Sequence, residues 1–220
     1  MSAIPLQALF AVPFASVPLA LPPELNSALA PWLLEQATDA NHDPAYPADA
    51  LCFRGRETLF QGGHPGLATL RSEILSALCG VVMAASRLSA SEFDKLAVQV
   101  RGRLLLVRPN GCLAASNLPL ASWCALYCVA APAPTQERAD SAMLRLYEAR
   151  MGGMFLDASN AGLRPPFHPG HHLWRPVAGH LAVFPAAIMH EIALNRGDRE
   201  LMLIQARVRF AHPEQELPAW

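Results

Sequence analysis

Charged residues are scarce in this sequence, and lysine is almost absent. Asp, Glu, Lys and Arg together make up 16% of the 220 residues. Lys95 is the only lysine, and no Lys or Arg precedes Arg54. A net charge of −1 gives little attraction for a polyanion, so we expect no nucleic acid and no anionic membrane surface as partner. The composition favours a small molecule, a peptide or another protein as the partner.

Long hydrophobic runs are also missing, although hydrophobic residues make up 52% of the chain. Prolines interrupt the apolar N-terminal stretch, which lacks the positive charge of a secretory leader. No uninterrupted apolar stretch is long enough to cross a bilayer. We therefore expect a cytoplasmic protein, and the apolar N-terminal segment is compatible with a homodimer.

Cysteines at metal-binding spacing are the third absence. The five cysteines include no CxxC pair, and an odd number leaves one unpaired in any bridging scheme. Apolar neighbours around Cys124 and Cys128 favour buried thiols, which share one face if their segment is a strand. We expect no structural disulfide and no zinc knuckle.

Helical patterns dominate what is present before residue 90. The proline-rich stretch Leu6–Leu21 suits an edge strand. A helix is then predicted to open at Pro22-Pro23 and to end before Asp39. Apolar residues recurring at three and four predict a second helix over Leu67–Leu88.

Short strands are expected after Ser89, separated by turn residues such as Asn110-Gly111. Gly102 is interpreted as a bulge. Helices followed by strands indicate an α+β architecture with an antiparallel sandwich or open barrel. We expect a single domain over residues 1–220, with an N-terminal strand and supporting helices over 1–90 and a β core over 91–220. The predicted strands are Leu96–Val107, Trp123–Ala130, Met143–Tyr147, Leu181–Phe184 and Leu201–Phe210.

The last predicted strand has two different faces. Met202, Ile204, Ala206, Val208 and Phe210 alternate with Leu201, Leu203, Gln205, Arg207 and Arg209. One face is therefore dry and the other carries cations. Before this strand, His190 and Arg199 flank an Asn195–Asp198 turn, which can bring an imidazole and a guanidinium to one pocket. Histidine is the commonest metal ligand, and arginine is the side chain best suited to bind a carboxylate through two parallel hydrogen bonds.

These residues also resemble a known family, the small bacterial 2-oxoglutarate/Fe(II) oxygenases. The resemblance runs loosely through nearly the whole chain and implies a double-stranded β-helix, or jelly-roll barrel, after a helical N-terminal part. It implies Fe(II) and 2-oxoglutarate as cofactors if the protein is active. Its strongest segment is Gly179–Pro185 leading to His190. The other matching segments are Leu9-Phe10 with Pro13, Glu24–Asn26 with Leu29, Gly63–Pro65, Trp123–Val129 with Pro132, and Leu144–Arg150.

The resemblance assigns roles to four residues. His190 matches the distal iron-binding histidine, and Arg199 matches the arginine that pairs with the distal carboxylate of 2-oxoglutarate. Gln205 falls where such proteins often carry Asn, and Tyr127 lies on a strand that would face the cosubstrate. Other arginines, at positions 145, 150, 207 and 209, are alternative anion partners or ordinary surface charge.

The other two iron ligands of the family do not match. The family has His and then Asp or His two residues later, before the Trp123–Val129 strand, but Ser116-Asn117-Leu118 stands there. A neutral hydroxyl binds Fe(II) weakly and an isobutyl group does not bind it. A cupin-like barrel, which shares the Gly179, Pro185 and His190 spacing, would need an upstream HxH and Glu that are also missing.

Two hypotheses follow from these missing ligands. In the first, the protein is a degenerate oxygenase, a pseudoenzyme that acts as a binding or partner subunit. In the second, it is an active Fe(II)/2-oxoglutarate-dependent dioxygenase, a hydroxylase with replacement ligands from the Phe167–His172 loop. His168 with His171 or His172 would then complete the metal site. That loop can equally be a solvated segment without metal.

Overall fold

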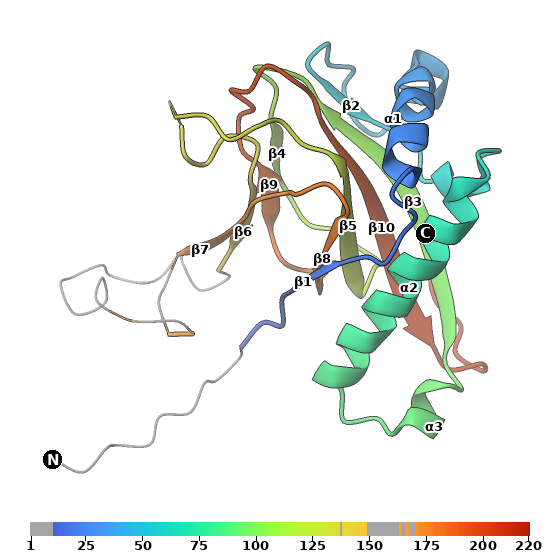
Figure 1. Ribbon diagram of the computed structural model, residues 1–220. Helices are drawn as coiled ribbons and strands as arrows, with labels where there is room; N and C mark the ends of the chain where they lie inside the picture. Colours follow the sequence, from blue (N-terminus) through green and yellow to red (C-terminus); the bar gives the residue numbers. More distant parts are fainter. Residues whose placement is uncertain (1–10, 137, 149–162, 164–165, 168–169) are drawn as a thin grey trace, which may run out of the picture.

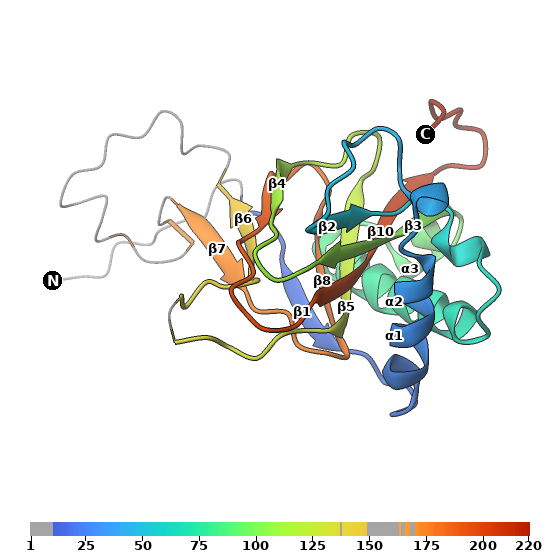
Figure 2. The same ribbon diagram turned by 90° about the horizontal axis from the view of Figure 1, so that it is seen from above.

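The computed structural model describes residues 11–136, 138–148, 163, 166–167 and 170–220. Within this part of the chain, two antiparallel sheets and a few helices form the fold (Figure 1). The larger sheet has the strand order β1-β8-β5-β10-β3-β2, and the smaller sheet has the order β4-β9-β6-β7. Figure 2 shows the smaller sheet on one side of the larger sheet and helices α1 and α2 on the other.

The larger sheet contains the strands that the sequence predicted best. It consists of β1 (Ala15–Pro18), β2 (Cys52–Arg54), β3 (Ala97–Val107), β5 (Trp123–Ala130), β8 (His180–Pro185) and β10 (Leu201–Ala211). The smaller sheet consists of β4 (Leu113–Ser116), β6 (Leu144–Tyr147), β7 (His171–Trp174) and β9 (His190–Ile192). Strands β2, β4, β7 and β9 were not predicted, because three or four residues are too few to display a period.

Helices cover one face of the larger sheet. Helix α1 (Leu25–Gln36) and helix α2 (Gly66–Ala85) correspond to the two predicted helices, and α3 (Ala90–Phe93) is a short addition. Leu29 and Leu33 of α1, and Leu70 and Ile74 of α2, join a core with the sheet residues that face them. The Tyr127 hydroxyl donates a hydrogen bond of 2.7 Å to Asn26 Oδ1 and so ties α1 to β5.

Helix α2 is long and apolar enough to cross a membrane by length and composition alone. Five of its residues, at a spacing of three and four, are buried instead against the larger sheet. They are Leu67, Leu70, Ile74, Leu78 and Val82. This packing explains the hydrophobicity of that side of the helix.

The opposite face of the larger sheet packs against the smaller sheet around a second core. From β10, only Leu201 and Leu203 belong to this core, whereas Ile204, Ala206 and Val208 belong to the helix-side core. The predicted division of β10 into two faces is therefore confirmed. Cys124 and Cys128 share the face toward the smaller sheet, and all five cysteines are free.

Gly102 does not form the predicted bulge. The register between β3 and β10 is continuous past Gly102, which pairs with Ala206. A Cβ atom at Gly102 would lie 2.4 Å from Phe60 Cε2, so the glycine is required for the close approach of an aromatic ring. The irregularity of β10 lies between Met202 and Leu203, where it pairs with β5.

Candidate functional site

His190 lies at the start of β9, in the middle of the smaller sheet. It pairs with Ser116 on β4 and with Leu146 on β6. Its Nδ1 lies 2.8 Å from the carbonyl oxygen of Ile188, and its ring meets Phe184 edge-on with centroids 5.1 Å apart. Burial lowers the pKa of His190; the hydrogen bond to Ile188 opposes that shift, and the charge of Arg54 adds to it. The imidazole is thus held neutral and oriented.

The structure brings three of the predicted positions together with His190. Ser116, Leu118 and Gln205 line the same small pocket, which we call the His190 pocket. Because Ser116 and His190 are register partners, side chains at these two positions point to the same side of the sheet. The positions assigned to the missing iron ligands therefore do adjoin the remaining histidine.

The donor set of the His190 pocket does not fit an Fe(II) ion. It offers one imidazole, a neutral hydroxyl at Ser116 and an isobutyl group at Leu118. Glu191 and Gln205 also line the pocket. The Glu191 carboxylate is hydrogen-bonded to Arg145, and Gln205 offers only a neutral amide. Among the described residues, no group of three His, Cys, Asp or Glu side chains is close enough to hold a metal.

The His190 pocket is also very small. Its cavity has a volume of about 20 Å³, whereas pockets for small molecules usually have about 300 Å³ or more. Leucine and isoleucine side chains fill the space between the two sheets. Arg54 lines the pocket as well, and its positive charge opposes the binding of a cation. The buried leucine and isoleucine residues of this region are Leu105, Leu113, Leu118, Leu126, Leu144, Leu146, Leu201, Leu203 and Ile192.

The histidines proposed as replacement ligands are not gathered at His190. His168 lies outside the described residues. His171 and His172 lie on β7, the outermost strand of the smaller sheet, and both are exposed. His172 pairs with Leu146, which in turn pairs with His190, so a buried leucine separates the two histidines in this row. The ring of His172 lies against Phe14 with centroids 4.6 Å apart.

Arg199 does not line the His190 pocket. It is exposed in the turn before β10, and its carbonyl oxygen accepts a hydrogen bond of 2.8 Å from Asn195 Nδ2. Asn195 is fully buried. Its Nδ2 also donates to the carbonyl oxygen of Val107, and its Oδ1 accepts from the Gly197 amide. The predicted turn is therefore present, but it directs Arg199 to the surface.

Tyr127 lies on the helix side of the larger sheet. It belongs to the core formed with α1 and α2, while its neighbours Leu126 and Cys128 face the smaller sheet and its core. Its hydroxyl is bound to Asn26. The predicted orientation toward a cosubstrate is therefore not observed, because alternate residues of a strand point to opposite faces.

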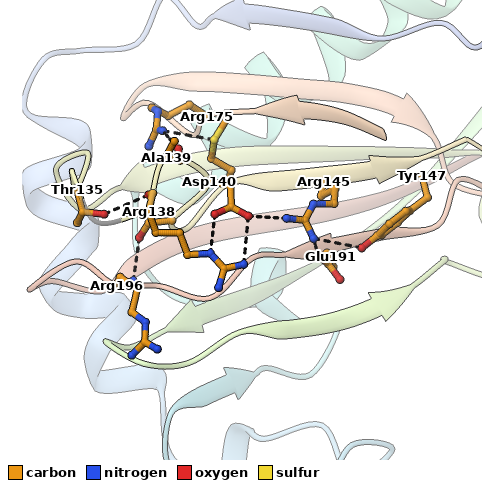
Figure 3. A network of polar contacts seen from close by, with 11 residues as sticks. Thr135, Arg138, Ala139, Asp140, Arg145, Tyr147, Arg175, Glu191 and Arg196 are labelled. Atoms are coloured by element: carbon orange, nitrogen blue, oxygen red, sulfur yellow. Dashed lines mark hydrogen bonds and ion pairs between the residues drawn. The ribbon is translucent and has the colours of Figure 1, made fainter. Parts of the chain in front are cut away.

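The other candidate arginines that the structure describes, Arg145, Arg207 and Arg209, have partners. Arg145 contacts Asp140 and Glu191, both at 2.5 Å, in the polar network that Figure 3 shows. Arg207 contacts Glu57 and the carbonyl oxygen of Pro119, and Arg209 contacts Gln99 and the carbonyl oxygen of Pro218. Arg150 lies outside the described residues.

Sequence reasoning missed a second group of polar residues on β3 and on the loops on either side of β2. Arg103 is buried and is bound to both Asp43 and Glu57. Arg101 lies on the same face of β3 and approaches Glu57 at 3.9 Å. The alternation of Gln99, Arg101 and Arg103 is the same signal that was recognised in β10, and it was available in the sequence.

Comparisons with known proteins identify the fold. No family model matches the sequence, and a search of curated proteins finds no match. Among solved structures, a Pseudomonas putida prolyl-4-hydroxylase has 19% identity and a TM-score of 0.55, over 90% of this chain and 92% of that chain.

Two further similar structures come from antibiotic-related enzymes. The non-heme alpha ketoglutarate dependent epimerase SnoN from nogalamycin biosynthesis has 11% identity and a TM-score of 0.60, over 90% of this chain and 78% of that chain. HygX from Streptomyces hygroscopicus, solved with nickel, 2-oxoglutarate and hygromycin B, has 14% identity and a TM-score of 0.56. The match covers 90% of this chain and 83% of that chain. The chain therefore has the jelly-roll fold of the 2-oxoglutarate/Fe(II) oxygenases.

Proposed function

We propose that this protein has the oxygenase fold but does not bind iron. It functions as a binding protein, either by binding a ligand of its own or as a subunit of a partner protein. The observation that carries the proposal is the His190 pocket. One imidazole, one hydroxyl and one isobutyl group adjoin there in a cavity of about 20 Å³. Fe(II) in such folds needs several anionic or imidazole donors and open coordination positions, and the described residues supply one strong donor.

The filled interior supports the same conclusion for 2-oxoglutarate. Leu201 and Leu203 are completely buried at the start of β10, and the predicted carboxylate partner Arg199 is exposed outside the pocket. A dicarboxylate in the His190 pocket would have Arg54 as its one cationic lining residue, and the cavity of about 20 Å³ is too small to hold it. The protein thus retains the fold, but few of its described residues could bind Fe(II) or 2-oxoglutarate.

An anaerobic titration tests the proposal. Purified protein, freed of metal by a chelator, is titrated with Fe(II) and 2-oxoglutarate by calorimetry and by visible spectroscopy. We expect no charge-transfer band and no Fe(II)-dependent heat above that of buffer. A charge-transfer band that reports binding with a dissociation constant in the micromolar range would contradict the proposal.

The alternative is an active oxygenase with replacement ligands, which would require His172 to reach the metal past Leu146. His172 and His190 occupy the same row of the smaller sheet, two strands apart, with Leu146 between them. If the titration gives a band, His172→Ala should abolish it under this alternative. His212→Ala, which changes an exposed histidine at the end of β10, is the matched control.

A further inference from the structure

A larger cavity lies beside the His190 pocket, on the same face of the larger sheet. Its volume is about 510 Å³. Gln205 lines the His190 pocket, and Arg207, the next residue on that face of β10, lines the larger cavity. We call this cavity the arginine groove. Its charged lining residues are Asp43, Arg56, Glu57, Arg101, Arg103 and Arg207.

The arginine groove is positively charged, although the whole chain has a net charge of −1. Four arginines and two carboxylates line it, so 4 − 2 leaves a net charge of +2. A cleft lined by one sign of charge concentrates ligands of the opposite sign. The ligand that this lining attracts is an anion.

The arrangement of these arginines is costly for the fold. Arg101 on β3 lies directly opposite Arg207 on β10, and like charges at directly opposite positions destabilise a sheet. Arg103 lies two residues further along the same face. Glu57 contacts all three guanidinium groups, and Asp43 pairs with Arg103 as well, so two carboxylates serve three cations there. A bound anion would relieve the remaining repulsion.

Two buried donors in the groove have no partner. The Nε atoms of Arg103 and Arg207 are buried and make no hydrogen bond to any described residue. The side chain of Arg103 is only 4% exposed. Buried donors are nearly always paired, because an unpaired one loses its hydration without compensation.

Aromatic rings hold the guanidinium groups in place. The guanidinium carbons of Arg101, Arg207 and Arg209 lie 5.2, 5.0 and 4.4 Å from the centroid of the Trp220 ring. The guanidinium of Arg103 lies 5.6 Å from the centroid of Tyr46. Stacking on these rings holds the planar guanidinium groups in a fixed orientation before a ligand binds. Both rings also line the groove and offer apolar surface to the body of a ligand.

We propose that the arginine groove binds a small organic anion through its carboxylate or phosphate group. Arginine forks match both groups with paired hydrogen bonds, and the volume of about 510 Å³ suits a small molecule rather than a bare ion. This inference rests on the proposed function, because it names the ligand class of a protein that binds rather than oxidises. It does not involve the His190 pocket.

Calorimetry of the full chain in a chelator and low salt tests the inference, with phenyl phosphate and phenylacetate as separate probes. At least one probe should bind with a dissociation constant of about 1 mM or lower, and the stronger binder identifies the oxyanion. Arg101→Gln should weaken that binding about tenfold. It should not lower the melting temperature, because it removes the like-charge pair and Arg101 is 45% exposed.

Arg87→Gln is the matched control, since Arg87 is exposed on the loop after α2 and the variant changes the net charge equally. It should leave binding unchanged. No binding of either probe would overturn the inference, and so would equal affinities for Arg101→Gln and the unaltered protein. Because a chelator is present throughout, this result is separate from the iron titration: iron binding would refute the proposed function and leave the groove intact.

Discussion

Ser116 on β4 and His190 on β9 are direct register partners across the smaller sheet. A pair of metal ligands at these positions would face one ion, because side chains of partner residues lie on the same side of a sheet. The backbone frame of a metal site is therefore present, and only one of its side chains is a strong donor. This relationship makes the site open to reconstruction.

Ser116→His combined with Leu118→Asp should create a metal site. The variant supplies a second imidazole and a carboxylate beside His190, which is the donor set that divalent transition metals prefer. We expect Co(II) binding, measured by visible absorption, and a Co(II)-dependent rise in melting temperature. Adding His190→Ala should abolish both signals. A folded double variant without Co(II) binding would show that the three positions do not converge.

Leu203→Ala should destabilise the protein strongly. Leu203 is completely buried between the two sheets, so its truncation leaves a cavity and should cost about 2–5 kcal/mol in unfolding free energy. Urea denaturation measures this change. Leu88→Ala, at a residue that is 39% exposed, serves as the control and should have an effect within about 0.5 kcal/mol. Equal effects would mean that the interior is not tightly filled.

Tyr127→Phe tests the role of Tyr127 in stability rather than in ligand binding. Loss of its hydrogen bond to Asn26 should lower the unfolding free energy by about 1 kcal/mol. Phenyl phosphate or phenylacetate binding should not change, because Tyr127 is on the helix side of the sheet. A double-mutant cycle with Asn26→Ala isolates the pair, and additive effects would contradict a direct interaction.

Ionisation of the Glu57 carboxylate should make the unfolding free energy of the protein depend on pH. Burial alone would raise its pKa, but hydrogen bonds and charges from Arg207 and Arg103 outweigh burial and lower the pKa below the ordinary value of 4.5. Its contribution is therefore complete above about pH 4.5 and is lost as the pH falls through the lowered pKa.

Glu57→Gln should lower the unfolding free energy by about 3 kcal/mol at pH 7, because Arg207 loses its ion pair and Arg103 keeps only Asp43. It should also flatten the loss of stability below about pH 4.5. Urea denaturation at several pH values measures both effects. Glu35→Gln, at an exposed position of α1, should change neither, and an unchanged acid profile in Glu57→Gln would refute the assignment.

Periodicity predicted the long elements of the fold and the short strands β6 and β8, but it did not predict β2, β4, β7 and β9. The two helices and the strands β3, β5 and β10 span 8 to 20 residues, long enough for several repeats. Strands β4 and β9 have four and three residues. His190 was therefore identified through the turn that follows it and through family resemblance, not through the pattern of its own strand.

The orientation of Tyr127 was not predictable for a different reason. Strand β5 is buried on both faces, so its sequence is a nearly continuous apolar run without alternation. Either face could carry the tyrosine. Arg199 was assigned from the turn that separates it from His190 and from the family resemblance. Fully buried Asn195 fixes that turn in a form that leaves Arg199 outside.

The arginine groove is assembled from segments that are far apart in the chain. Asp43 and Glu57 flank strand β2, Arg101 and Arg103 come from the middle of the chain, and Arg207 and Trp220 come from its C-terminal part. Each segment alone has an ordinary local composition. Relatives that share this groove would consequently escape a search for short consecutive motifs, and would be found by comparing the spatial positions of guanidinium groups on superimposed jelly rolls.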